Sequence, residues 1–310
     1  MPEISHVINE QIPPDLRLDR YVSEILRLFS RSQIKARNAR AKVNGKDVKF
    51  SRFVKRNDVL ELFWDDFSPE YIIPQPIPLE IIYEDERCVV ISKAQGMVVH
   101  PGAGNRQGTM ANALYFRMMN RNLSDDNINL RSGIVHRLDK ETSGVIIAAY
   151  DEEAHAFLAH QFKTRRARKT YIAIVQGVLK ERTGRIETFL SRDPKDRRYF
   201  SVSSAGKKAV TFYKTVKIWK NHCLVLLRPK TGRTHQLRVH LKYLGNPIMG
   251  DPVYGGKDKI FPEANLMLHS RRLEITLPGE SQARVFSSAV PQRFIEIIKK
   301  LDRLESGNGN

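Results

Sequence analysis

The sequence is poor in cysteine and contains no long apolar run. Only Cys88 and Cys223 occur among 310 residues, which excludes a disulfide framework and a cysteine-based zinc site and fits a reducing compartment. No apolar stretch approaches the roughly 20 residues of a membrane-spanning helix, and the N-terminus has neither a basic start nor an apolar signal core. We therefore expect a cytoplasmic protein without a membrane role.

Acidic residues are scarce relative to basic ones. The chain has 52 Lys and Arg against 34 Asp and Glu, which gives a formal net charge of +18. Such an excess favours a polyanionic partner, most often nucleic acid. The alternative is a basic surface that makes contacts without chemistry, and the motifs must decide between the two.

The charges are also unevenly distributed along the chain. Residues 31–56 contain ten Lys or Arg and one acid, whereas residues 57–86 contain nine acids and no Lys or Arg. Four prolines fall between residues 68 and 78, and proline neither continues a helix nor donates to a strand ladder. The pattern predicts a small domain over residues 14–67, a linker over residues 68–78 and a large domain over residues 79–303.

The predicted small domain combines helical spacing with a hairpin signal. Apolar residues recur at helical intervals in residues 16–29, and a second, basic helix is expected around Ile34. Asn44-Gly45 is a strong two-residue turn signal, and residues 59–63 alternate like a returning strand. The basic side chains expected to contact a polyanion here are Arg31, Lys35, Arg37, Arg40 and Lys46.

A polar run in the large domain precedes an apolar one. Residues 133–144 read Gly-Ile-Val-His-Arg-Leu-Asp-Lys-Glu-Thr-Ser-Gly, and five apolar residues follow. The apolar residues predict a buried strand, so the polar run lies at a strand end where side chains reach a cleft. Asp139 stands there with Arg137 and Lys140 close by. For an isolated aspartate, a surface turn with a structural ion pair is the alternative interpretation.

Two further blocks carry side chains suited to chemistry. Residues 163–169 hold five cations and lead to Tyr171, whose ring offers a face for stacking and a hydroxyl for hydrogen bonding. Residues 231–240 hold Arg238, and a buried carboxylate requires such a cationic partner. We expect the latter block to be a strand, along which Leu237 and Val239 alternate toward opposite sides.

Two histidines of the last block raise the question of a metal. His235 and His240 are five residues apart, without a third ligand or the spacing of a helical zinc site. We therefore expect no metal.

Together these blocks resemble the signature of the RluA family of pseudouridine synthases, which isomerise uridine within RNA. The resemblance covers roughly residues 76 to 300 and is carried by residues 133–144, by Lys169-Thr170-Tyr171 and by residues 231–252. Residues 14–65 resemble the S-four-type RNA-binding domain, named for a small-subunit ribosomal protein, through Leu18-Asp19-Arg20, residues 30–35 and Val43-Asn44-Gly45.

The resemblance implies specific roles. Asp139 would be the catalytic carboxylate, Tyr171 would lie against the flipped base and Arg238 would pair with Asp139. Arg137 would fill the space that the base leaves. The base pocket would include Leu237 and Val239, and further RNA contacts would come from Arg165, Arg166, Arg168 and Arg233. Because the reaction involves neither redox change nor hydrolysis, no cofactor is expected.

The expected fold is α+β. Runs of strand pattern outnumber helices and alternate too irregularly for a doubly wound parallel sheet, so we expect a mixed, mostly antiparallel sheet with a central cleft, plus a small N-terminal α+β RNA-binding domain. In the family that the chain resembles, an N-terminal RNA-binding module accompanies the members that act on large-subunit ribosomal RNA. The resemblance therefore implies that substrate, with transfer RNA possible, and we expect a monomer. The competing hypothesis is a catalytically silent RNA-binding ribosome-assembly factor.

Overall fold

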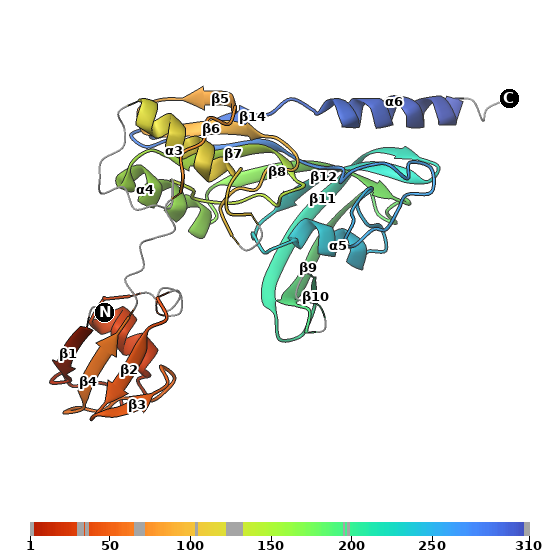
Figure 1. The fold of residues 1–310 in the computed structure, drawn as a ribbon. Coiled ribbons are helices and arrows are strands. Elements are labelled where there is room, and N and C mark those ends of the chain that lie inside the picture. Colours follow the sequence, from red (N-terminus) through yellow and green to blue (C-terminus); the bar gives the residue numbers. More distant parts are fainter. Residues whose placement is uncertain are drawn as a thin grey trace. The chain divides into compact units, whose positions relative to one another are not determined.

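The computed structural model describes residues 3–29, 34, 37–64, 72–102, 105–121, 133–194, 196 and 199–306. The chain divides into two compact units, an N-terminal unit of residues 1–71 and a C-terminal unit of residues 72–310 (Figure 1). Each unit has a hydrophobic core of its own: Leu18, Tyr21 and Leu60 are buried in the first, and Ile146 and Phe294 in the second. Each unit therefore has the apolar contacts to fold around its own centre.

The N-terminal unit is built on a small antiparallel sheet. Its strands are β1 (Glu3–Val7), β2 (Arg40–Val43), β3 (Lys46–Val48) and β4 (Val59–Phe63), in the order β1-β4-β2-β3. The predicted hairpin at Asn44-Gly45 is confirmed, because β2 pairs with β3 and both turn residues have the positive φ that such a turn requires. The predicted strand over residues 59–63 is β4.

The helical part of this unit differs from the prediction. The helix predicted over residues 16–29 is shorter and consists of α1 (Leu18–Arg20), which runs into the π-helical turn η1 (Tyr21–Ile25). Strand β1 was not predicted, yet it pairs along its whole length with β4. Of the second predicted helix, Ile34 is described and buried, whereas Arg31 and Lys35 lie outside the described residues.

The C-terminal unit is organised around one ten-stranded sheet. Its order is β10-β9-β11-β12-β8-β13-β7-β6-β5, with β14 paired to β13. The strands are β5 (Glu80–Glu84), β6 (Cys88–Lys93), β7 (Ser143–Ala149), β8 (Arg168–Gln176), β9 (Thr183–Arg192), β10 (Phe200–Val202), β11 (Lys207–Trp219), β12 (His222–Pro229), β13 (Leu268–Thr276) and β14 (Ala283–Ser287). All pairings are antiparallel except that of β7 with β13. The predicted α+β fold with a mixed, mostly antiparallel sheet is confirmed.

Helices cover this sheet in different places (Figure 1). They are α3 (Met110–Asn120), α4 (Glu152–Lys163), α5 (Gln236–Tyr243) and α6 (Gln292–Ser306). Helix α4 packs beside β7, and α5 packs beside β9, β10 and β11. The Asp151 side chain caps α4 by accepting from the backbone N–H of Ala154, as acidic residues do at helix N-termini. No helix in the described part of the chain has both the length and the apolar character needed to cross a membrane.

Residues 231–240 do not form the predicted strand. Residues from Gln236 onward form α5, which begins after His235 in a left-handed conformation with φ of 55°. The strand prediction is wrong because the polar residues of this block find partners inside the unit. Gln236 donates to the carbonyl of Val210, and the ring nitrogens of His240 lie 3.0 and 2.9 Å from the hydroxyls of Thr188 and Thr211.

The described part of the predicted linker packs against the rest of the C-terminal unit. Ile72 is buried, the Asn112 side chain donates to the carbonyl of Ile73, and the backbone N–H of Gln75 donates to the carbonyl of Asn112. Residues 72–78 therefore lie along the start of α3 and are held there by hydrogen bonds.

Candidate active site

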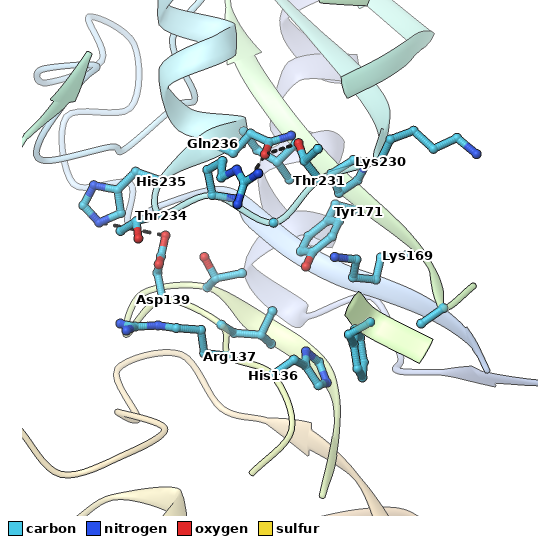
Figure 2. A pocket seen from close by; sticks show the side chains of 18 of the residues that line it. His136, Arg137, Asp139, Lys169, Tyr171, Lys230, Thr231, Thr234, His235 and Gln236 are labelled. Carbon is cyan, nitrogen blue, oxygen red and sulfur yellow. Dashed lines mark hydrogen bonds and ion pairs between the residues drawn. The ribbon is translucent and has the colours of Figure 1, made fainter. Parts of the chain in front are cut away.

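One cavity of about 560 Å³ gathers the side chains that the sequence singled out. It is lined by residues 135–139, by α4 and β8, and by residues 229–238, so its wall comes from segments that are far apart in the sequence. Asp139, Tyr171 and Arg238 all line it, and Figure 2 shows Asp139 and Tyr171 on facing sides. Tertiary folding thus brings the three blocks to one place.

A glycine at the end of the polar run sets the position of Asp139. Gly144 is the second residue of β7 and has a φ of 113°, a conformation that L side chains rarely adopt. A Cβ at this position would lie 2.1 Å from the carbonyl oxygen of Ser270 on β13. Only glycine lets the two parallel strands come this close, and the loop that carries Asp139 enters β7 at this point.

A buried lysine holds the loop that carries Asp139. Lys93 is 1% exposed, and its ammonium donates to the carbonyls of Ala94, Met97 and Lys140. Burial lowers the pKa of Lys93 to about 8, while three carbonyl acceptors satisfy its three donors. The residue next to Asp139 is therefore tied to the strand-β6 side of the unit.

Arg238 lies between two carboxylates. Its Nη1 is 3.8 Å from Oδ2 of Asp139, whereas its Nε and Nη2 donate to Asp251 at 2.7 and 2.6 Å. Asp251 has no exposed surface and also accepts from the backbone N–H groups of Val253 and Tyr254. The predicted ion pair of Arg238 with Asp139 is present in the structure, and Asp251 is a second, closer and bidentate partner that was not predicted.

Sequence reasoning missed the role of Asp251. The residue lies in the last resembling block, but an acid thirteen positions after Arg238 cannot be paired with it by spacing alone. A signal was nevertheless present, since a buried arginine requires a carboxylate and Asp251 stands between Gly250 and Pro252, where a tight turn is expected.

His235 is a second neighbour of Asp139 that the sequence considered only as a metal ligand. Its Nε2 lies 4.0 Å from Asp139 Oδ2, and its Nδ1 lies 2.9 Å from the hydroxyl of Tyr254. Burial lowers the pKa of His235 below its ordinary value, so the ring is neutral at pH 7. No group of three or more His, Cys, Asp or Glu side chains in the described ranges is placed to hold a metal ion.

The opposite wall of the cavity is aromatic and apolar. Tyr171 is buried, and this burial raises the pKa of its phenol to about 12, so the hydroxyl is protonated at neutral pH. Leu237 also lines the cavity. Val239 does not; it packs in a core cluster with Leu190, Ala209 and Tyr254. The expectation that Val239 belongs to the pocket is wrong because residues two apart on a helix differ by about 200° in direction.

His136 has a structural environment. Its Nε2 accepts a hydrogen bond from the backbone N–H of Ile147, and its ring stacks on Phe162 at 4.3 Å between centroids. Burial lowers its pKa to about 3, with Lys169 as a smaller cause. A neutral ring that accepts a backbone hydrogen bond holds the polar run against β7.

The predicted RNA contacts fall in several places. Arg165 and Arg233 line the cavity with the exposed Arg137. Arg166 is exposed outside the set of lining residues, and Arg168 pairs with Glu274 at 3.0 Å. In the N-terminal unit, Arg40 and Lys46 are exposed, and the guanidinium of Arg37 lies 4.9 Å from the ring centroid of Phe29.

Comparison with known proteins agrees with this geometry. The family described as RNA pseudouridylate synthase matches residues 87–243. The chain is 45% identical to ribosomal large subunit pseudouridine synthase D of Borreliella burgdorferi, over 94% of this chain and 92% of that protein. It is 35% identical to the protein of the same name from Pseudomonas aeruginosa, over 92% of each.

A solved structure is similar as well. The human RNA pseudouridylate synthase domain containing 4 is 26% identical, with a TM-score of 0.56, and the match covers 72% of this chain and 93% of that one. The family match includes Asp139, Tyr171 and Arg238, all of which line the cavity. The chain belongs to the family of RNA pseudouridylate synthases.

Proposed function

We propose that this chain isomerises uridine to pseudouridine in large-subunit ribosomal RNA, with Asp139 as the catalytic carboxylate. The observation that carries the proposal is the convergence of Asp139, Tyr171 and Arg238 on one cavity from three distant segments. The choice of ribosomal RNA is supported by the names of the relatives from Borreliella burgdorferi and Pseudomonas aeruginosa.

The reaction makes simple chemical demands. The N1–C1′ bond of uridine breaks, the uracil turns, and a C5–C1′ bond forms, so no electrons or water are consumed. Asp139 acts either by attacking C1′ or by taking the 2′ proton, and carboxylates assist at anomeric carbons in glycosidases in a comparable way. Its side chain is 22% exposed, so a substrate can reach the carboxylate oxygens directly.

The cavity supplies a place for the flipped base. Taking a base out of its stack costs a few kcal/mol, and the exposed Arg137 at the cavity would occupy the space that the base leaves. Tyr171 would lie against the uracil ring with Leu237 nearby. Because the phenol of Tyr171 stays protonated, it can hydrogen-bond the base without adding a negative charge beside Asp139.

Basic residues at the cavity and outside it would hold the RNA backbone. In the N-terminal unit these are Arg37, Arg40 and Lys46 together with Arg31 and Lys35, and in the C-terminal unit Arg165, Arg166, Arg168 and Arg233. The ten cations of residues 31–56 support an RNA-binding role for the N-terminal domain over residues 14–67. We further propose that the protein acts in the cytoplasm as a monomer.

Mapping of pseudouridine tests this proposal. Cells that lack the gene should lose pseudouridine at specific positions of large-subunit ribosomal RNA, and the wild-type gene should restore them while Asp139→Asn should not. In vitro, the purified protein should modify a large-subunit transcript in preference to transfer RNA. Modification of transfer RNA alone would contradict the proposed substrate. Unchanged pseudouridine in both RNAs would favour the catalytically silent assembly factor.

A further inference from the structure

Lys169 lies in the cavity beside Tyr171. Both residues are on strand β8 and are two positions apart, so their side chains point to the same face of the sheet. Both line the cavity, and Figure 2 shows the Lys169 side chain next to the Tyr171 ring. The ammonium therefore lies on the wall against which the base is proposed to stand.

The surroundings of this ammonium are aromatic rather than acidic. Its Nζ is 5.9 Å from the ring centroid of Phe162, its charge acts on the neutral ring of His136, and Figure 2 shows the lysine side chain beside Tyr171. Among the described residues, no carboxylate forms an ion pair with Lys169. Burial lowers its pKa, and no described carboxylate offsets that effect. Lys169 is half-buried, and a cation partly shielded from water without a partner is costly, so it is expected to stabilise an anionic group of the bound substrate.

Space for such a partner is left by a glycine. A Cβ on Gly232 would lie 3.6 Å from the Lys169 Nζ, which is an ordinary van der Waals contact, so the glycine places no side chain against the ammonium on that side. The motif Thr231-Gly232-Arg233 thus keeps one side of the ammonium open within the cavity wall.

We infer that Lys169 is a catalytic residue that stabilises the negative charge of the detached uracil. The inference rests on the proposed function, in which Tyr171 and Asp139 bracket the uridine. When the N1–C1′ bond breaks, its electron pair leaves with the uracil, and the charge spreads over N1, O2, O4 and C5. At the same time C1′ either bonds to an oxygen of Asp139 or forms a double bond to C2′ as the 2′ proton moves to Asp139.

The remaining steps form the new C–C bond and leave Lys169 unchanged. The C5 carbon of the uracil anion attacks C1′. On the first route this attack breaks the ester bond to Asp139, and on the second C2′ takes its proton back from Asp139, so the carboxylate is regenerated on either route. The proton on C5 is then released, and N1 takes up a proton. Lys169 stays protonated throughout and acts through its fixed charge. Fixed donors aimed at developing charge in a site shielded from water are among the largest contributions to catalysis.

A leaving-group comparison tests the role. Wild type, Lys169→Met and Lys169→Arg are compared in single-turnover reactions on one minimal RNA that carries either uridine or 5-fluorouridine at the target, with loss of the N-glycoside measured by digestion to nucleosides. Fluorine withdraws electrons and stabilises the uracil anion by itself. We expect Lys169→Met to slow the uridine reaction by ~10²- to 10³-fold, and the 5-fluorouridine reaction by clearly less. Lys169→Arg should recover part of the rate, because it keeps the charge with a different shape.

Controls separate this role from others. Lys299→Met, which removes an exposed cation of α6, should react like wild type, and RNA affinity should be unchanged in Lys169→Met. Equal slowing on both substrates would overturn the inference, as would a loss confined to RNA affinity, which would assign Lys169 to a phosphate. If Lys169→Met folds poorly by circular dichroism, Lys169→Gln gives the same comparison.

Asp139→Asn in the same assay tests the proposed function separately, since wild-type activity in that variant would refute the carboxylate role whatever Lys169 does.

Discussion

The two units of this protein use positive charge in opposite ways. In the N-terminal unit, basic residues such as Lys46, Arg52 and Arg56 are exposed. In the C-terminal unit, Arg238 is 4% exposed and is held by both oxygens of Asp251. Exposed cations can exchange counterions for RNA phosphates, whereas a buried ion pair fixes the position of a group. The difference suggests that one unit contributes affinity and the other contributes geometry.

Asp139 combines the exposure of a binding residue with the fixed surroundings of a buried ion pair. It is partly exposed like a binding residue, yet it lies 3.8 Å from the buried Arg238. A reactive carboxylate must be reached by substrate and must also be held in place. The firm pairing of Arg238 with Asp251 leaves Asp139 free to contact a substrate without removing the nearby cation.

The largest expected effect separates chemistry from stability. Asp139→Asn should lower the rate of pseudouridine formation by ~10⁴-fold or more, as loss of an essential carboxylate does, because the amide is neither nucleophile nor base. The free energy of unfolding should change by less than about 1 kcal/mol, since partly exposed ion pairs contribute little. Single-turnover kinetics and urea unfolding measure the two. Glu141→Gln removes the same charge two residues away and should remain active; loss of activity in that variant would mean that loop charge alone matters.

Asp251→Asn should show the opposite pattern. It leaves the guanidinium of Arg238 buried without its bidentate partner, and breaking a buried pair costs about 3 to 5 kcal/mol. We expect a large drop in the free energy of unfolding, measured by urea denaturation, together with reduced activity because Arg238 is no longer fixed. A drop below about 1 kcal/mol would show that Asp251 does not hold the arginine.

Deletion of residues 1–71 should act on binding. The C-terminal unit keeps its own core and all the residues that line the cavity, so the rate on a minimal RNA at saturating concentration should be nearly unchanged. Affinity for structured RNA should fall, and the dependence of log affinity on log salt should flatten by about one unit for each RNA phosphate that the N-terminal unit neutralises. An unchanged slope and affinity, measured by filter binding at several salt concentrations, would mean that the exposed cations of the N-terminal unit are only solvated.

The smallest effect concerns acid stability. Burial lowers the pKa of His240 from 6.5 to about 4, so between these values the unfolded chain binds the proton and the folded one does not. The free energy of unfolding should therefore fall as the pH is lowered from about 6.5 to about 4. His240→Gln should reduce this fall by up to about 1.4 kcal/mol per pH unit in that window, measured by urea unfolding at a series of pH values. If His240→Gln and wild type show the same dependence of the unfolding free energy on pH, His240 is excluded as its source.

Local sequence was informative wherever chain neighbours decide the structure. The Asn44-Gly45 turn and the strand after residues 133–144 follow from turn chemistry and apolar periodicity, both of which are local. The mostly antiparallel sheet could be expected from the number and irregularity of strand patterns. Strand β1 was not predicted, because its five residues alternate only weakly between apolar and polar. They become a strand by pairing with β4, which lies far along the chain.

The site divides in the same way. The sequence by itself determined which side chains to propose for the chemistry, because the blocks around Asp139, Tyr171 and Arg238 are contiguous and distinctive, and the structure places all three at one cavity. Only the tertiary structure decided that residues 236–243 form a helix, that Leu237 faces the cavity while Val239 does not, and that Asp251 holds Arg238. These outcomes depend on which buried polar groups find partners across the fold, and such partners lie at sequence distances that no local pattern encodes.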